Sequence, residues 1–206
     1  MIDYRQEFED KGYFTGVAVL DDSEKEEIIS IIDQIEKNVI SHPENKKEQD
    51  PNSPSRLRKI NDLALNNQYF LKISKKPKIL DIVETCIGGD IKLFGDQLFM
   101  KPPGGIEKTS HQDSPYFPIF PMNLISCWIA LDDVNEENGC LKCIPGSHKW
   151  GALPHTEKWM VGGREDMCIP KDQIGDKEEV SIHLTAGNAS FHHSLLVHRS
   201  GPNNTS

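Results

Sequence analysis

Residues 189–201 read ASFHHSLLVHRSG, in which a β-prone run over 189–197 leads into a turn at Gly201. Shorter β-prone runs occupy residues 140–144 and 180–184, and longer ones occupy residues 91–101 and 124–131. Turn residues separate these runs, as in Asn138-Gly139, Pro145-Gly146-Ser147 and Ala186-Gly187-Asn188. From about residue 90 onward, the sequence therefore predicts a series of strands joined by tight turns.

Helical patterns dominate the part of the chain before residue 90. Ser23 lies three residues before Glu26, a capping-box spacing, and isoleucines at positions 28, 31, 32 and 35 follow at helical spacing. A second helix is expected from about Pro77 to the glycines at 88–89, and a short strand at 15–20. Residues 41–55 hold no apolar residue outside their prolines, which predicts a surface loop or inserted lid. Helices followed by strands favour helices packed on the outside of an all-β barrel or sandwich.

Length and composition limit the class of protein. The 206 residues suit one domain, and a net charge of -9 without a long basic run argues against nucleic-acid binding. The start has no apolar leader and no 18 uncharged apolar residues run together, so we expect neither a secretory signal nor a membrane span. Five scattered cysteines are then best interpreted as reduced thiols in a cytoplasmic protein.

The sharpest chemical pattern is His111-Gln112-Asp113. In extended backbone, residues i and i+2 project to the same face, so this imidazole and this carboxylate can bind one cation together. Two histidines and one carboxylate on one face of an octahedron are typical of iron(II) sites that bind dioxygen. His192, His193 and His198 are candidates for the third ligand. His198 stands at a strand end, where loops open onto a pocket, and His192 would share its face as a possible partner.

The stretch from Phe99 to Ser206 resembles the phytanoyl-CoA dioxygenase family of iron(II) and 2-oxoglutarate-dependent oxygenases. The resemblance rests on short motifs that occur in the family's order and spacing. These are Met100-Lys101-Pro102-Pro103, His111-Gln112-Asp113, Tyr116-Phe117-Pro118, Cys127-Trp128-Ile129-Ala130-Leu131, Asn138-Gly139-Cys140-Leu141, Pro145-Gly146-Ser147-His148 and Val197-His198-Arg199-Ser200-Gly201-Pro202-Asn203. More than half of the chain is covered by this match.

The resemblance implies a mainly β fold, the double-stranded β-helix (jelly roll, cupin-like), with N-terminal helices packed on one sheet. Residues 1–206 would form a single oxygenase domain, helical over about 1–89 and jelly roll over about 90–206. It implies His111, Asp113 and His198 as the iron ligands. It also places Lys101, Trp128 and Ser200 in the 2-oxoglutarate pocket.

One expected part of the family pattern has no match in this sequence. Relatives place an arginine ten or eleven residues beyond the last histidine ligand, where it pairs with the far carboxylate of 2-oxoglutarate. Here Ser206 follows His198 by only eight residues, so the jelly roll is expected to be incomplete at its C-terminal end. Arg199 is a poor substitute, because its side chain should leave the strand on the face opposite His198.

The implied reaction is hydroxylation of a C–H bond in a small organic substrate, with Fe²⁺, 2-oxoglutarate and O₂ consumed to give succinate and CO₂. Halogenating relatives replace the carboxylate ligand with a small residue, so Asp113 favours hydroxylation. Neither the substrate nor the oligomeric state follows from the sequence. Candidate substrate contacts are Gln97, Tyr116, Phe117, Phe120, Arg164 and the loop at 148–163. Two alternatives remain, a non-catalytic jelly-roll binding protein and a cupin-type metalloenzyme that does not use 2-oxoglutarate.

Overall fold

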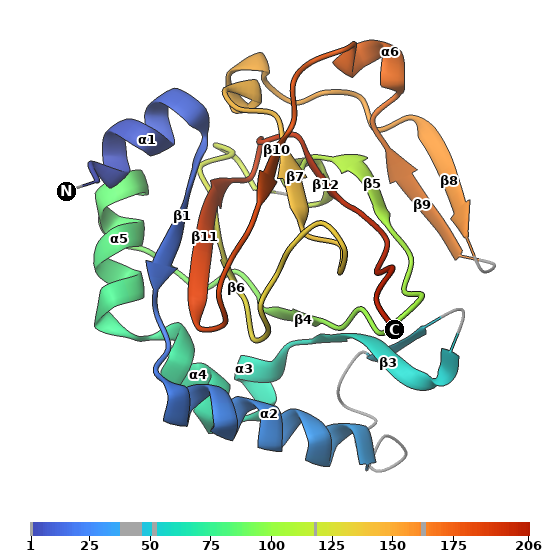
Figure 1. Ribbon diagram of the computed structural model, residues 1–206. Coiled ribbons are helices and arrows are strands. Elements are labelled where there is room, and N and C mark those ends of the chain that lie inside the picture. Colours follow the sequence, from blue (N-terminus) through green and yellow to red (C-terminus); the bar gives the residue numbers. More distant parts are fainter. Residues whose placement is uncertain (1, 38–46, 51–52, 118, 162–163) are drawn as a thin grey trace.

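The computed structural model describes residues 2–37, 47–50, 53–117, 119–161 and 164–206 (Figure 1). Its α-helices are α1 (Tyr4–Lys11), α2 (Asp22–Lys37), α3 (Leu63–Asn66), α4 (Gln68–Ser74), α5 (Pro77–Ile87) and α6 (Lys171–Ile174). Two short 3-10 helices are η2 (Ser114–Tyr116) and η3 (Ser147–Trp150). The strands are β1 (Tyr13–Ala18), β2 (Lys47–Asp50), β3 (Ser53–Asn61), β4 (Gln97–Phe99), β5 (Lys108–His111), β6 (Ile125–Ile129), β7 (Leu141–Cys143), β8 (Glu157–Val161), β9 (Arg164–Cys168), β10 (Val180–Ile182), β11 (Asn188–His193) and β12 (His198–Ser200).

Two antiparallel sheets build the centre of the described chain. The first has the strand order β1-β11-β6, and the second has the order β10-β7-β12-β5. A third sheet, β2-β3-β4, and the hairpin β8-β9 complete the strands. Strands far apart in sequence thus lie side by side, which brings β5 and β12 together. The fold is mainly antiparallel sheet with helices, as the sequence predicts.

Strand β11 shows why the first sheet has two different faces. Ala189 and Phe191 are fully buried on one face, where the Phe191 ring stacks on Phe14 with centroids 5.2 Å apart. Isoleucines of α2, α4 and α5 belong to the same core cluster, so the N-terminal helices cover this face, as predicted (Figure 1). Ser190 and His192 alternate with these residues and line a cavity on the opposite face together with residues of β7 and β10.

A second apolar cluster joins the two central sheets. Ala130, Cys143, Ile182, Leu184 and Leu196 are its buried members, and Trp128 packs against them. Trp128 and Ala130 come from β6 or its end, and Cys143, Ile182 and Leu184 come from β7, β10 or the residues just after β10. Leu196 comes from the turn between β11 and β12. Apolar side chains therefore fill part of the space between the sheets, and His192 and His198 line the cavity next to them.

The helix boundaries follow local chemistry, with one correction. The capping box of α2 uses Asp21 and Glu24, and not Ser23 and Glu26. The Asp21 carboxylate accepts from the Glu24 N–H at 2.9 Å, and the Glu24 carboxylate accepts from the Asp21 N–H at 3.0 Å. Helix α5 begins at Pro77 and ends before Gly88, as expected. Within the described residues, no helix has both the length and the apolar character that crossing a bilayer requires.

Two expectations about strands were wrong. Only β4 forms within residues 91–101, and it pairs with β3 outside the central sheets. Residues 47–50 and 53–55 belong to the hairpin β2-β3 where a loop was expected, because the rest of β3 pairs with β4 and buries Leu57 and Ile60. Residues 41–46 and 51–52 of that expected loop lie outside the described residues.

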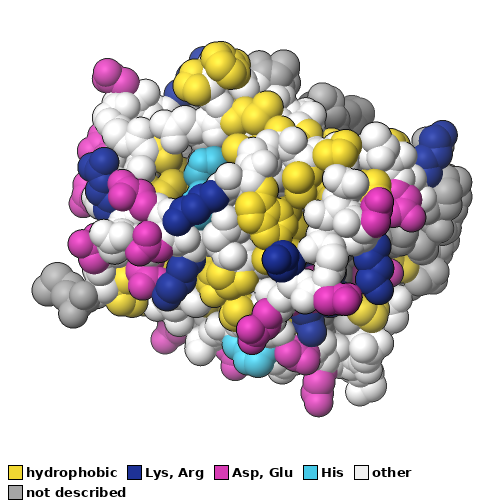
Figure 2. Space-filling view, turned by 90° about the horizontal axis from the view of Figure 1, so that it is seen from above, with side chains coloured by type: hydrophobic (Ala, Val, Ile, Leu, Met, Phe, Trp, Pro, Cys, Tyr) yellow, Lys and Arg dark blue, Asp and Glu magenta, His cyan; other side chains and the backbone are white. Residues whose placement is uncertain are grey.

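The surface seen in Figure 2 mixes all side-chain types. Hydrophobic side chains gather near the middle of this face, and basic and acidic side chains alternate around them (Figure 2). Several large apolar residues are exposed, among them Phe120 at 94% and Phe94 at 53%. Phe120 therefore does not belong to the hydrophobic core.

Candidate metal centre

The pairing of β5 with β12 places two histidines side by side. His111 and His198 are direct partners in this antiparallel pair, and their ring centroids are 4.2 Å apart. Directly opposed residues of an antiparallel pair point to the same face of the sheet. The β-sheet register thus brings together two residues that stand far apart in the sequence, and both are buried.

Asp113 joins this pair from the end of β5. Its backbone N–H donates to the carbonyl oxygen of Ser194 at 2.9 Å, which anchors the turn into η2. Its Oδ1 lies 3.8 Å from Nε2 of His111 and 3.7 Å from Nε2 of His198. One ligand atom from each of the three residues lies within 4.8 Å of the other two. The structure thus brings the three predicted ligands into one cluster.

The backbone sets the tautomer of both histidines. Nδ1 of His111 lies 2.8 Å from the carbonyl oxygen of Thr109, and Nδ1 of His198 lies 2.9 Å from that of Leu196. A carbonyl oxygen only accepts, so both Nδ1 atoms carry the proton and both Nε2 atoms offer a lone pair. This is the state in which histidine binds metals, with the distal N–H fixed by a hydrogen bond.

Electrostatics prepare the same cluster for a cation. Burial, together with the neighbouring His198, lowers the pKa of His111 to about 3, and burial also lowers the pKa of His198. Burial alone would raise the pKa of Asp113, but the facing imidazoles of His198 and His192 bring it well below its usual range. At neutral pH the three residues therefore supply two neutral nitrogen donors and one carboxylate.

Two further residues orient the carboxylate of Asp113. The hydroxyl of Ser126 donates to Oδ2 at 3.0 Å, and Nε2 of His192 lies 3.6 Å from the same oxygen. His192 was expected to approach by sharing a strand face with His198. That reason was wrong, because the chain turns at residues 194–197 and the two histidines stand on different sheets. Ser126 was not predicted from the sequence, although it stands two residues before Trp128 on β6 and therefore points to the same face of the sheet.

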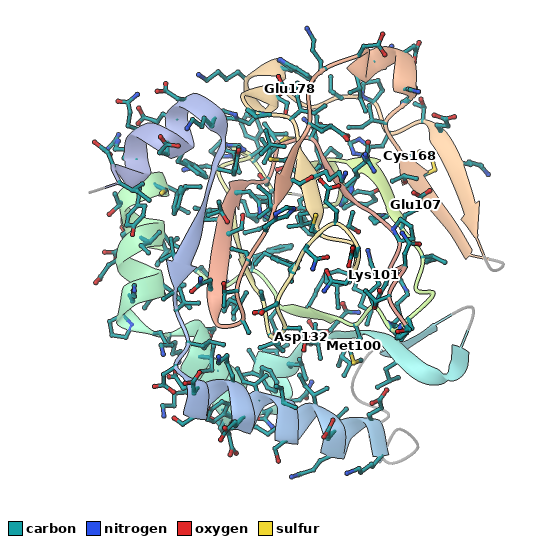
Figure 3. All side chains as sticks on the ribbon, viewed as in Figure 1. Met100, Lys101, Glu107, Asp132, Cys168 and Glu178 are labelled. Atoms are coloured by element: carbon teal, nitrogen blue, oxygen red, sulfur yellow. The ribbon has the colours of Figure 1, made fainter. Side chains whose placement is uncertain are left out.

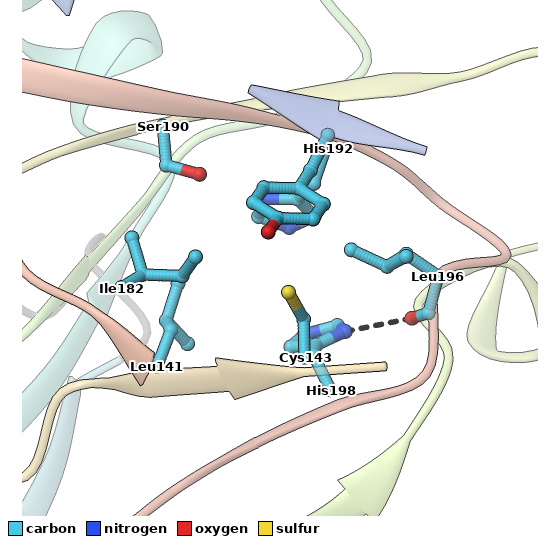
Figure 4. A pocket seen from close by; sticks show the side chains of 8 residues that line it. Leu141, Cys143, Ile182, Ser190, His192, Leu196 and His198 are labelled. Atoms are coloured by element: carbon cyan, nitrogen blue, oxygen red, sulfur yellow. Dashed lines mark hydrogen bonds between the residues drawn. The ribbon is translucent and has the colours of Figure 1, made fainter. Parts of the chain in front are cut away.

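A cavity adjoins the histidine cluster between the two sheets. Ser190 and His192 lie on its upper side in Figure 4, and Leu141, Cys143 and His198 lie below them. Ile182 and Leu196 add apolar walls, and Tyr13 also lines the cavity. Burial raises the pKa of the Cys143 thiol to about 12, which keeps the thiol protonated. Apolar side chains, one thiol, two hydroxyls and two imidazoles thus line this cavity.

The structure brings together two of the three residues predicted to hold 2-oxoglutarate. Nζ of Lys101 donates to Oγ of Ser200 at 2.8 Å and also to the carbonyl oxygen of Gly201. Lys101 lies close to the C-terminal segment that follows β12 (Figure 3). Burial lowers the pKa of Lys101 to about 8. Trp128 packs in the cluster between the sheets, directly opposite Ser190 of β11. Trp128 thus lies on the inner side of the first sheet, as a cosubstrate contact would require.

The remaining expected residues divide into three kinds. Gln112 points away from the cluster, as predicted, and its fully buried amide bonds the carbonyl oxygens of Gly151 and Leu195. Arg199 also points away, and its guanidinium pairs with Glu179. Among the candidate substrate contacts, Tyr116 lies beside His111, with ring centroids 6.3 Å apart. Residues 162–163 and the side chain of Arg164 lie outside the described part of the structure.

Comparison with known proteins gives a consistent family match. The family model described as "Phytanoyl-CoA dioxygenase (PhyH)" matches residues 8–206. The human protein "Phytanoyl-CoA dioxygenase, peroxisomal" is 35% identical over 159 residues, which cover 74% of this chain and 47% of that protein. "Probable alpha-ketoglutarate-dependent hypophosphite dioxygenase" of Stutzerimonas stutzeri is 26% identical over 98% of this chain and 73% of its own length.

Solved structures share the same fold. The crystal structure of EctD from S. alaskensis with 2-oxoglutarate and 5-hydroxyectoine has a TM-score of 0.81. It is 19% identical, and the match covers 99% of this chain and 72% of that one. At that identity the likeness concerns the fold alone. The chain spans about half the length of the phytanoyl-CoA dioxygenases it matches.

Proposed function

The chain belongs to the phytanoyl-CoA dioxygenase family, and on that premise we propose that it is a non-haem iron(II) oxygenase. It would use 2-oxoglutarate and O₂ to hydroxylate a C–H bond of a small organic molecule, releasing succinate and CO₂. The observation that supports this most is the convergence of His111, Asp113 and His198 within 4.8 Å. Two imidazoles and one carboxylate are the donor set typical of iron(II) oxygenases.

The residues present fit a ferrous ion. Both histidine Nε2 atoms are unprotonated because their Nδ1 atoms donate to backbone carbonyls. Asp113 supplies the single negative charge. Its second oxygen, Oδ2, accepts a hydrogen bond from Ser126 and lies beside Nε2 of His192. Bound iron(II) would supply the redox chemistry that activates dioxygen, and three protein donors leave coordination positions for cosubstrate and gas.

We propose that Lys101 and Ser200 bind the far carboxylate of 2-oxoglutarate. The half-buried ammonium of Lys101 lies 2.8 Å from the hydroxyl of Ser200. Ser200 is the last residue of β12, two residues beyond His198, so the pair forms a cationic site close to the proposed ligands. A carboxylate there would satisfy both donors and would restore the pKa of Lys101 toward its ordinary value. Trp128 would form an apolar wall of the same pocket and exclude water from it.

The finer description of the fold is also part of this proposal. The two central sheets, with α2, α4 and α5 packed against one face of the first, support a double-stranded β-helix (jelly roll, cupin-like) within one domain over residues 1–206. All five cysteines are free thiols, which supports a reducing compartment such as the cytoplasm. The partner is a small-molecule substrate of unidentified structure.

The test uses the purified chain with iron(II) under anaerobic conditions. Adding 2-oxoglutarate should change the electronic spectrum of the iron complex, and admitting O₂ should release succinate slowly even without substrate. Asp113→Ala should abolish both signals, whereas His148→Ala serves as a control outside the cluster. A binding protein would show no succinate, and a cupin-type enzyme independent of 2-oxoglutarate would show no spectral change. Undiminished succinate release from Asp113→Ala would refute the assignment of its role.

A further inference from the structure

His155 holds the peptide bond between His111 and Gln112, which lies in the stretch that links the proposed metal ligands His111 and Asp113. Its Nε2 accepts a hydrogen bond from the backbone N–H of Gln112 at 2.8 Å. Its Nδ1 lies 2.9 Å from the carbonyl oxygen of Leu153. Because a carbonyl only accepts, Nδ1 carries the proton and Nε2 offers its lone pair to the Gln112 N–H. The backbone around His155 thus selects the one neutral tautomer that can accept this bond.

The position of Gln112 explains why an acceptor is needed there. Strand β5 ends at His111, so the strand ladder does not extend to the Gln112 N–H. Gln112 is fully buried, and a buried N–H without a partner is costly. The imidazole of His155, which follows η3, accepts the hydrogen bond from this N–H.

The side chain of Gln112 ties the same two segments together. Its amide nitrogen donates to the carbonyl oxygen of Gly151 at 2.8 Å, and its Oε1 accepts from the N–H of Leu153 at 2.8 Å. The His155 ring also meets the ring of Tyr116 edge-on, with centroids 5.5 Å apart. The segment 151–155 therefore contacts the ligand-bearing turn through backbone, amide and ring contacts.

We propose that His155 is a positioning residue for the metal centre, an inference that rests on the proposed function. It acts through the peptide bond between His111 and Gln112. The orientation of this peptide sets the direction of His111 directly and that of Asp113 through Gln112. Loss of the acceptor frees this peptide to rotate and misaligns two ligands together. Outer partners of this kind change metal affinity by about 10- to 100-fold when they are removed.

The experiment measures Co²⁺ binding by the full chain, with Co²⁺ as a spectroscopic substitute for iron(II). Three variants are compared with the unaltered protein by titration of the visible absorption and by far-ultraviolet circular dichroism. His155→Ala removes the acceptor, and His155→Gln places an amide oxygen near the position of Nε2. His148→Ala is the matched control, because this half-buried histidine contacts Glu9 and not the ligand turn.

We expect His155→Ala to weaken Co²⁺ binding about 10- to 100-fold with an unchanged fold. His155→Gln should recover most of the affinity, and His148→Ala should bind as the unaltered protein does. Equal affinity of His155→Ala and the unaltered protein, or an equal loss in His148→Ala, would overturn this inference while leaving the proposed function intact. No Co²⁺ binding by the unaltered protein would overturn both.

A second measurement covers the case in which the alanine variant does not fold. In the unaltered protein, ¹⁵N chemical shifts of the His155 ring at neutral pH should show a protonated Nδ1 and an unprotonated, hydrogen-bonded Nε2. A protonated Nε2 would leave no lone pair for the Gln112 N–H and would exclude the proposed role.

Discussion

Lys101 should make the stability of the chain depend on pH in an alkaline window. Its side chain is half-buried, and burial lowers its pKa from 10.5 to about 8. In the unfolded chain the side chain regains its ordinary pKa. Between pH 8 and 10.5 the folded protein has therefore released a proton that the unfolded chain still holds. Stability rises with pH wherever the unfolded state binds more protons, so unfolding should become harder across this window.

The size of the effect follows from the two pKa values. Their difference, 10.5 minus about 8, is about 2.5 pH units, and each unit corresponds to about 1.36 kcal/mol. The full effect is thus about 3 kcal/mol, of which about 2 kcal/mol falls between pH 7.5 and 10. The substitution Lys101→Met retains the length of the side chain and removes the titrating group.

The assay is urea unfolding of the unaltered protein and of Lys101→Met, without metal or 2-oxoglutarate, at pH 7.5 and at pH 10. Other alkaline groups titrate in both proteins and cancel in the comparison, including Tyr13, whose pKa burial raises to about 12. From pH 7.5 to 10, the unaltered protein should gain about 2 kcal/mol relative to the variant. Parallel pH dependences in the two proteins would show that Lys101 is not held in a low-pKa environment, and the reasoning would fail.

Three further substitutions test separate parts of the structure. Ser126→Ala removes the hydroxyl that donates to Asp113 at 3.0 Å, so Co²⁺ affinity by titration should fall about 10-fold; an unchanged affinity would deny Ser126 that role. Phe191→Ala empties a fully buried site between the first sheet and the helices, and should lower the free energy of unfolding in urea by about 3–5 kcal/mol. A loss below 1 kcal/mol there would contradict the assigned core. Glu179→Ala breaks a partly exposed ion pair with Arg199 and should cost at most about 1 kcal/mol, with Co²⁺ binding unchanged.

Much of the site could be predicted because its signals are local. The i, i+2 spacing of His111 and Asp113 already places both side chains on one face. The same alternation on β11 separates Phe191, in the core beneath the helices, from His192, beside Asp113. Local chemistry also set the limits of α5, because proline favours the first helical position and Gly88 ends the helix.

What could not be predicted depends on register and on long-range partners. The opposition of His111 and His198 arises from the pairing of β5 with β12, which no pattern within either segment specifies. The run at 189–197 looked like one strand, yet it turns after His193, where the N–H of Leu196 donates to the His193 carbonyl. The hairpin β2-β3 formed from a polar stretch because β4 was available as a neighbour. The role of His155 had no local signal, since its partner is a backbone N–H 43 positions away.

The charges of the proposed site account for the chemistry of its cosubstrate. Two neutral imidazoles and the Asp113 carboxylate together carry one negative charge, so a bound ferrous ion leaves the cluster with one positive charge. Protonated Lys101, which donates to Ser200 two residues beyond His198, adds a second. 2-Oxoglutarate is a dianion with one carboxylate at each end, and it would neutralise both positive charges at once. The low pKa of Lys101 then has a direct consequence: cosubstrate binding should weaken as pH rises through about 8, because the ammonium that we propose to receive the far carboxylate is lost.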